Sequence, residues 1–239
     1  MQSVAETKGN INGEENMLTE FDLMYMGRGY TRLQLYKSAL ARWGLTGKEH
    51  VLDAGCGYGA WTYALSKLNE YVLGIEKDED KSRIAMEIVE DNAGNVDVFT
   101  CDIEELNGKT YADEQFDGIL CYHTIYYTSN WRKTLESLAS LMTPGGVMYI
   151  NIATKACFMY MAQSDNTITA KMGVDALNND RKRSKGEDYS TESGLPIDQK
   201  EFETELTRMH LDITWKGSDE VACHPGVIGY VVERMHNDM

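Results

Sequence analysis

The sequence predicts an α/β fold in which a mostly parallel sheet is covered by helices on both faces. Three observations support this. Short apolar runs alternate with segments whose apolar residues recur at helical spacing, the first run ends in a glycine-rich turn, and two apolar runs close the chain without a helix between them. Continuous apolar strands separated by helices are typical of a parallel sheet. Two strands in direct succession most simply pair as an antiparallel hairpin.

The part before this alternation is expected to be a tail and a cap. Residues 1–16 are polar, and we expect them to be disordered. Residues 17–46 are expected to form an N-terminal helical cap, with a short helix, a break at Gly27-Arg28-Gly29 and an amphipathic helix that ends at Gly44. Residues 17–239 then form one domain, which suits this chain length.

The alternating elements follow in order. The strands expected in the parallel part are 50–53, 71–76, 96–100, 116–121 and 145–152. The helices expected between them are 61–68, 81–89 and 131–142, and a helix at 199–209 leads to the closing strands 211–215 and 227–233. Residues 155–195 break the rhythm. Their first part is rich in Met and aromatic residues and their second part is charged, so we expect an irregular segment.

Charge and composition narrow the class of partner. The net charge is −15 and the isoelectric point is near 4.7, and a surface this acidic disfavours nucleic acid, which basic patches usually bind. The one basic cluster, residues 181–185, is flanked by acids and is interpreted as a solvated loop. No apolar run is long enough for a membrane span and no export signal is seen, so we expect a cytoplasmic protein.

The five cysteines are scattered and form no C-x-x-C pair. Neither a metal site nor a disulfide framework is therefore expected. Small buried packing residues are the simplest interpretation of these side chains.

The glycine-rich turn carries the main functional signal. It reads Val51-Leu52-Asp53-Ala54-Gly55-Cys56-Gly57-Tyr58-Gly59-Ala60-Trp61. Glycines allow a tight turn and a close approach of the backbone to a nucleotide-like ligand. Gly55, Gly57 and Ala60 also fit the loose dinucleotide fingerprint, so the turn alone leaves the ligand open.

Three acids at consecutive strand ends separate the possible ligands. Asp53 closes the first strand, Glu76 closes the second and Asp102 lies just past the third, so the three are expected to line one crevice. Glu76 stands where an acid takes ribose hydroxyls. Asp53 would repel the pyrophosphate of NAD but would suit the sulfonium and ammonium of S-adenosylmethionine. Each acid also has a structural alternative: a helix cap, an exposed strand end or the start of a loop.

With these residues the chain resembles the class I S-adenosylmethionine-dependent methyltransferases, from about Phe21 to the final strand. The matching motifs are 51–59, Glu76, Cys101-Asp102-Ile103 and Leu141-Met142-Thr143-Pro144-Gly145-Gly146-Val147. The resemblance implies a Rossmann-like, doubly wound sheet of seven strands, mostly parallel with an antiparallel C-terminal strand. It also implies S-adenosylmethionine as cofactor and S-adenosylhomocysteine as product.

The same resemblance assigns the cofactor-binding residues. Gly55 and Gly57 would approach the methionine part, Glu76 would bind the ribose, and Asp102 with Ile103 would hold the adenine. The other residues expected in this site are Asp53, Cys56, Trp61, Lys77 and Tyr122.

Candidate catalytic residues follow the fourth strand. His123 is expected as a general base towards a hydroxyl or an ammonium, because the ordinary pKa of histidine lies near neutrality. The alternative is a structural histidine near the methionine tail. Tyr122, Tyr126 and Tyr127 could shape a pocket or belong to the core.

The N-terminal cap also resembles the opening of small-molecule methyltransferases, including amino-sugar N-methyltransferases. This implies that Tyr25, a second candidate catalytic residue, or Tyr30 borders the sulfonium, and that Arg28 meets the cofactor carboxylate. A solvent-exposed helix break is the alternative.

Residues 155–197 take the position of the family's variable substrate lid. Residues 158–161 offer an adaptable apolar surface, which fits a small organic acceptor methylated on nitrogen or oxygen. They could equally pack on the sheet or at a homodimer interface. A methyltransferase of RNA or protein, or a cofactor-binding protein without catalysis, are the alternative functions.

Overall fold

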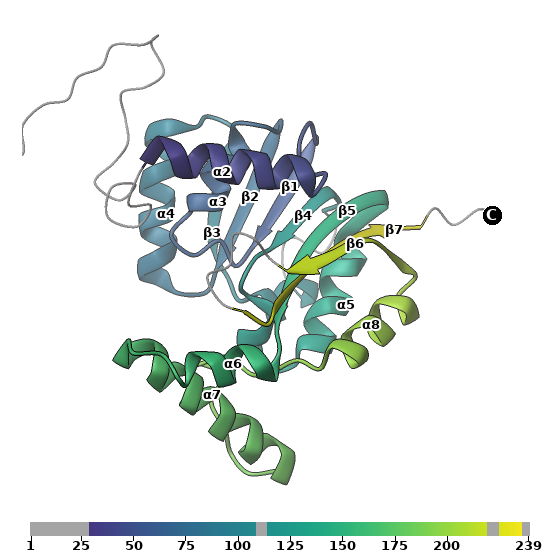
Figure 1. Cartoon of the computed structure of the whole chain (residues 1–239). Coiled ribbons are helices and arrows are strands. Elements are labelled where there is room, and N and C mark those ends of the chain that lie inside the picture. Colours follow the sequence, from purple (N-terminus) through teal and green to yellow (C-terminus); the bar gives the residue numbers. More distant parts are fainter. Residues whose placement is uncertain (1–28, 109–113, 219–224, 236–239) are drawn as a thin grey trace, which may run out of the picture.

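Seven strands form a single sheet in the computed structural model, which describes residues 29–108, 114–218 and 225–235. The strand order is β3-β2-β1-β4-β5-β7-β6 (Figure 1). The strands are β1 His50–Ala54, β2 Tyr71–Glu76, β3 Val96–Thr100, β4 Phe116–Cys121, β5 Met142–Ala153, β6 Leu211–Ser218 and β7 Val227–Arg234.

Strand direction follows the prediction. β1 to β5 pair in parallel, whereas β7 runs antiparallel to both β5 and β6. The closing hairpin and the mostly parallel, doubly wound sheet are therefore confirmed. The order reverses direction between β1 and β4, and ligands of such sheets bind at this switch point.

Helices cover both faces of the sheet (Figure 1). The helices α2 Gly29–Arg42 and α3 Ala60–Ser66 cover one face, with α4 Glu79–Asn92 beside α3. The helices α5 Trp131–Leu141 and α8 Gln199–Arg208 cover the other. The expected amphipathic helix of the cap is α2, while residues 1–28 lie outside the described part.

Burial on both faces explains the unbroken apolar strands. Val51 of β1 packs with Trp43 and Leu65 in one core, whereas its neighbour Leu52 packs with Leu135 in the other. Neighbouring residues of a strand point to opposite faces, so both must be apolar. Each buried side chain of this size contributes about 1.5–3 kcal/mol.

The segment expected to be irregular is helical, so that expectation was wrong. Residues 155–195 contain α6 Lys155–Met161 and α7 Thr167–Lys185. The side chain of Asn166 accepts hydrogen bonds from the backbone of Ile168 and Thr169 and begins α7, and Gly186 ends it with a φ of 71°. The apolar pattern was weak because small residues, Gly173 and Ala176, form the buried side of α7.

The basic cluster at 181–185 is also not a loop. It forms the last turn of α7, where cations interact favourably with the helix dipole. Arg183 in addition pairs with Asp180 at 2.7 Å.

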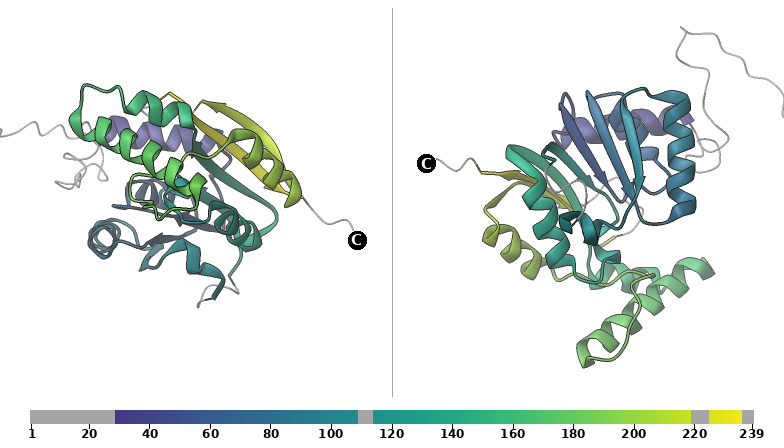
Figure 2. Two further views of the ribbon diagram at one scale, coloured as in Figure 1. Left: turned by 90° about the horizontal axis from the view of Figure 1, so that it is seen from below. Right: turned by 180° about the vertical axis from the view of Figure 1, so that it is seen from behind.

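The pair α6 and α7 extends beyond the carboxyl edge of the sheet (Figures 1 and 2). The two helices touch closely at Gly173, where a Cβ would lie 2.4 Å from the backbone nitrogen of Ala162. We call residues 155–197 the lid. Among the described helices, none is long and apolar enough to cross a membrane.

Candidate active site

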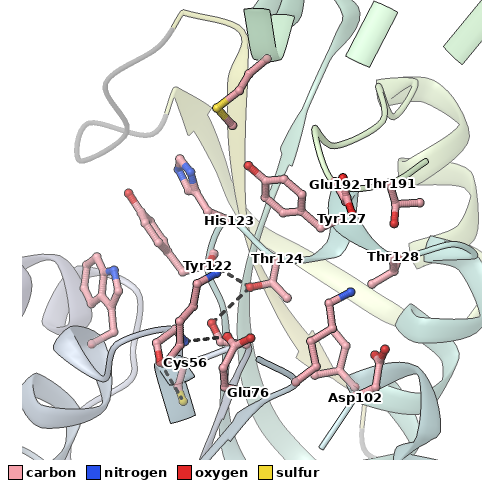
Figure 3. Close-up of a pocket in the computed structure, with 17 residues that line it drawn as sticks. Cys56, Glu76, Asp102, Tyr122, His123, Thr124, Tyr127, Thr128, Thr191 and Glu192 are labelled. Atoms are coloured by element: carbon pink, nitrogen blue, oxygen red, sulfur yellow. Dashed lines mark hydrogen bonds between the residues drawn. The ribbon is translucent and has the colours of Figure 1, made fainter. Parts of the chain in front are cut away.

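A cavity of 580 Å³ opens at the carboxyl edge of the sheet, between the glycine turn and the lid (Figure 3). Cavities of about 300–1,000 Å³ suit small-molecule ligands. The lining residues are Gly55, Cys56, Gly57, Trp61, Glu76, Lys77, Lys81, Asp102, Ile103, Tyr122, His123, Thr124, Tyr127, Thr128, Met172, Thr191 and Glu192.

Most of the residues singled out in the sequence meet in this cavity. Those brought together are Gly55, Cys56, Gly57, Trp61, Glu76, Lys77, Asp102, Ile103, Tyr122 and His123. Tyr25 and Arg28 lie outside the described residues, and Tyr30 is described only as backbone in the first turn of α2. The roles of these residues stay predictions.

The glycine turn is shaped by close packing. Gly55 has a φ of 85°, a conformation that side chains rarely adopt, and a Cβ on it would lie 2.3 Å from Thr124 Oγ1. The backbone of Gly55 and of Cys56 donates to the carbonyl of Ile75, at 2.8 and 2.9 Å. The turn is thus held between the ends of β2 and β4, where only glycine fits at position 55.

Glu76 is held in place at the end of β2. Its Oε2 accepts the N–H of Gly57 at 2.9 Å, and its Oε1 accepts the N–H of Asp78 at 3.0 Å. Asp78 in turn begins α4, because its side chain accepts the N–H groups of Asp80 and Lys81. These bonds fix the carboxylate in the cavity wall before any ligand arrives.

The loop after β3 forms the next part of the wall. Asp102 accepts the N–H of Glu104 at 3.0 Å, and Ile103 is buried beside it. Glu104 accepts hydrogen bonds from the backbone and hydroxyl of Ser129 and from the backbone of Asn130. Burial raises the pKa of Glu104, but these bonds outweigh it and lower the pKa. This carboxylate ties the Asp102 loop to the segment after β4.

Asp53 does not line the cavity, contrary to the expectation of three acids in one crevice. It is 1% exposed and lies against α3, where Thr62 Oγ1 donates to it at 2.7 Å. Burial raises its pKa to about 7, the Thr62 bond opposes the rise, and Glu76 adds to it. Glu76 and Asp102 alone of the three face the ligand space.

A row of aromatic rings lines the side of the cavity where β4 ends. Trp61 and Tyr122 lie with centroids 4.7 Å apart, and Tyr122 stacks on His123 at 4.4 Å. The backbone of His123 has a φ of 53°, and its N–H donates to Asn151 Oδ1 at 2.7 Å. His123 is therefore held in an uncommon conformation with its ring against the cavity wall (Figure 3).

Several lining residues were missed by sequence reasoning. Lys81 lies in the first turn of α4, which follows Glu76, and Thr124 follows the end of β4, so position alone could have suggested both. Met172, Thr191 and Glu192 belong to the lid and carry no motif. They reach the cavity only because α7 packs on α6 and the chain after α7 returns to the sheet domain.

The buried thiols offer no reactive nucleophile. Cys56, Cys101, Cys121 and Cys157 are buried and form no disulfide, and Cys223 lies outside the described residues. Burial raises the pKa of Cys121 to about 12 and that of Cys157 to about 11. Among the side chains that the structure describes, no group of three His, Cys, Asp or Glu could hold a metal ion.

The chain is similar to a known protein family and to several curated proteins. A family model described as a methyltransferase domain matches residues 45–207. Over 120 residues the chain is 28% identical to the ubiquinone biosynthesis O-methyltransferase of Actinobacillus pleuropneumoniae, covering 49% of this chain and 51% of that protein. Over 113 residues it is 30% identical to the Coxiella burnetii protein of the same name, covering 47% of each. The chain spans about half the length of these relatives.

Solved structures share the fold at low sequence identity. The N-methyltransferase NodS from Bradyrhizobium japonicum aligns with a TM-score of 0.59 at 14% identity, covering 87% of this chain and 98% of that chain. A methyltransferase from Aquifex aeolicus aligns with a TM-score of 0.59 at 19% identity, covering 92% and 100%. At these low identities, the similarity shows a shared fold.

Proposed function

Since this chain belongs to the methyltransferase domain family, we propose that it transfers the methyl group of S-adenosylmethionine to nitrogen or oxygen of a small organic acceptor. The family predicted from the motifs is thereby confirmed. S-adenosylhomocysteine would be the product. The observation that carries the proposal is the juxtaposition of the glycine turn, Glu76 and Asp102 around one cavity.

The residues present fit this cofactor. The space beside Gly55 and Gly57 suits close approach of a ligand to backbone, and we assign the methionine part to it. The fixed carboxylate of Glu76 can accept two ribose hydroxyls, and Asp102 with the apolar Ile103 can hold the adenine. Cys56, Trp61, Lys77 and Tyr122 complete the wall. Asp53 does not line the cavity and would act indirectly, since the glycine turn follows it in the chain.

When bound, S-adenosylmethionine supplies a methyl carbon on a sulfonium. The protein must align the acceptor and exclude water, and it must take a proton where the acceptor carries one. Among the described residues, His123 is the lining group suited to that proton transfer. Tyr25 stays a prediction.

The acceptor side of the cavity supports a small organic molecule. Tyr122, Tyr127 and Met172 offer aromatic and adaptable apolar surface there. A net charge of −15 disfavours RNA as acceptor. A cytoplasmic location suits a biosynthetic methyl transfer of this kind. We also propose that the lid forms a homodimer interface.

Binding measurements test the cofactor site. Isothermal titration of S-adenosylmethionine should show saturable binding that Glu76→Ala weakens by roughly tenfold or more, because hydrogen bonds to a charged group are lost. Glu79→Ala, an exposed acid in the first turn of α4, is the matched control and should bind normally. Unchanged affinity in the Glu76 variant would refute the assignment.

A labelling experiment tests the transfer itself. The protein is incubated with methyl-deuterated S-adenosylmethionine and a cell extract of its source, and mass spectrometry identifies what gains the label. A labelled small molecule supports the proposal, whereas label on RNA or protein alone, or on nothing, contradicts it.

A further inference from the structure

A second hollow, of 430 Å³, lies on the lid beside the cofactor cavity. Four of its lining residues, Asp175, Asn178, Asn179 and Lys182, recur along one face of α7 at helical spacing. The opposite wall is the returning loop, which contributes Ser190, Glu192 and Ser193.

This hollow is held open by hydrogen bonds and close packing. The N–H of Ser190 donates to Asn179 Oδ1 at 3.3 Å, which ties the loop to α7. Further along the chain, the N–H of Leu195 donates to the carbonyl of Tyr126 at 2.7 Å, which ties the loop to the segment after β4. The contact of Gly173 with α6 fixes the other side of α7.

Glu192 joins the hollow to the cofactor cavity, because it lines both. The cofactor cavity measures 580 Å³, which suits one ligand of drug size. With S-adenosylmethionine in it, space is left only for the reacting end of an acceptor. The rest of the acceptor can then extend past Glu192 into the second hollow, because Glu192 lines both spaces.

The lining of the hollow selects a ligand chemistry. Its side chains are all polar, and the two acids, Asp175 and Glu192, are balanced by Arg181 and Lys182. Apolar groups would therefore lie against mostly polar side chains, and for a phosphate the two carboxylates offset the attraction of the two cations. The remaining amides and hydroxyls both donate and accept hydrogen bonds, as a neutral polyhydroxylated group requires.

We propose that the second hollow binds a neutral, polyhydroxylated part of the acceptor, with the chemistry of a sugar, while the reacting end lies beside Tyr122 and His123. This inference rests on the proposed function for the role of the bound group. It makes the acceptor a two-part molecule whose polar part is recognised by the lid.

Ligand-observed NMR tests the proposal with defined probes. Maltose, cellobiose and N,N′-diacetylchitobiose are each added to the full chain with S-adenosylhomocysteine, next to inorganic phosphate and benzyl alcohol. At least one disaccharide should show saturation transfer. Asn178→Ala should weaken its binding by about three- to tenfold, the value of one hydrogen bond.

Two lysines in the same part of α7 give a matched control. Lys182 lines the hollow and Lys185 does not, so Lys182→Ala should weaken disaccharide binding and Lys185→Ala should leave it unchanged. Absence of binding by every disaccharide, or equal binding by all variants, would overturn the proposal. Preferred binding of phosphate or benzyl alcohol would overturn it as well.

Calorimetry with S-adenosylhomocysteine on the same samples separates the two proposals. Normal cofactor affinity in Asn178→Ala and Lys182→Ala, together with weakened disaccharide binding in both, supports the inference. A protein that binds a disaccharide but no S-adenosylhomocysteine would refute the proposed function, and with it the acceptor role of the hollow.

Discussion

His123 and Asn151 are joined by a hydrogen bond of 2.7 Å from the backbone N–H of His123 to Asn151 Oδ1. Asn151 lies on β5, fully buried, one residue beyond the last pair that links β4 to β5. Beyond the end of β4, the side chain of Asn151 therefore takes the place of a backbone acceptor for the N–H of His123. This bond holds His123 with a φ of 53°, and such strain is frequently found at functional sites.

The strain at His123 predicts an unusual order of variant stabilities. His123→Gly should be more stable than His123→Ala by about 1 kcal/mol, because glycine adopts a positive φ at little cost. Urea unfolding measures the difference. His50, which starts the extended strand β1, is the control, and there the order of Gly and Ala should be reversed. If the alanine variant is the more stable one at both positions, His123 is not strained.

Proton transfer by His123 predicts a change in the pH dependence of turnover. His123→Gln should lower kcat by about 10²- to 10⁴-fold, the usual value of a positioned base, and remove the acidic limb of the pH profile. The assay uses the acceptor found by labelling, and S-adenosylmethionine affinity is measured alongside. A variant with the profile of the wild type would leave His123 with a structural role.

Close packing at Gly55 predicts that an added methyl group disrupts the protein there more than at an unpacked glycine. Gly55→Ala should destabilise the protein and abolish cofactor binding, because its Cβ would lie 2.3 Å from Thr124. Gly47→Ala is the matched control, since it has a φ of 67° and nothing within 4 Å of a Cβ. It should cost only about 1–2 kcal/mol of backbone strain and leave binding intact. Equal losses in both variants would contradict the packing argument.

The place of the glycine turn, Glu76 and Asp102 around the cavity could be predicted because these residues stand at strand ends. The glycine turn, Glu76 and Asp102 follow apolar runs that both cores require, so their place on one edge follows from strand direction. Asp53 also ends an apolar run, but it is buried against α3, where Thr62 donates to it. Only the packing of α3 after the turn distinguishes this buried carboxylate from the two that line the cavity.

The lid half could not be predicted, because its placement depends on packing between distant residues. Met172 reaches the cavity through the contact of Gly173 with Ala162, and a single glycine in a polar segment gives no signal of that contact. Glu192 follows α7 in a stretch without apolar periodicity. The proposed acceptor-binding part of the site is thus formed by the segments with the weakest sequence signal.

Burial of Asp53 predicts a pH-dependent contribution to stability. Its pKa is about 7 in the folded protein against 3.8 ordinarily, so folding favours the protonated carboxyl. Its contribution is fully present below about pH 4, falls as the pH rises, and is lost above about pH 7. The difference of about three units between these two pKa values corresponds to at most about 4 kcal/mol of unfolding free energy.

Asp53→Asn removes this titration while its amide oxygen can still accept the hydroxyl of Thr62. Relative to the wild type, the variant should therefore gain stability steadily between pH 4 and pH 7, by up to a few kcal/mol. Urea unfolding across that range measures the difference, with Asp165→Asn on the exposed lid surface as control. A stability difference that stays constant with pH would show that Asp53 is ionised throughout. The buried carboxylate would then act on the glycine turn as a fixed charge.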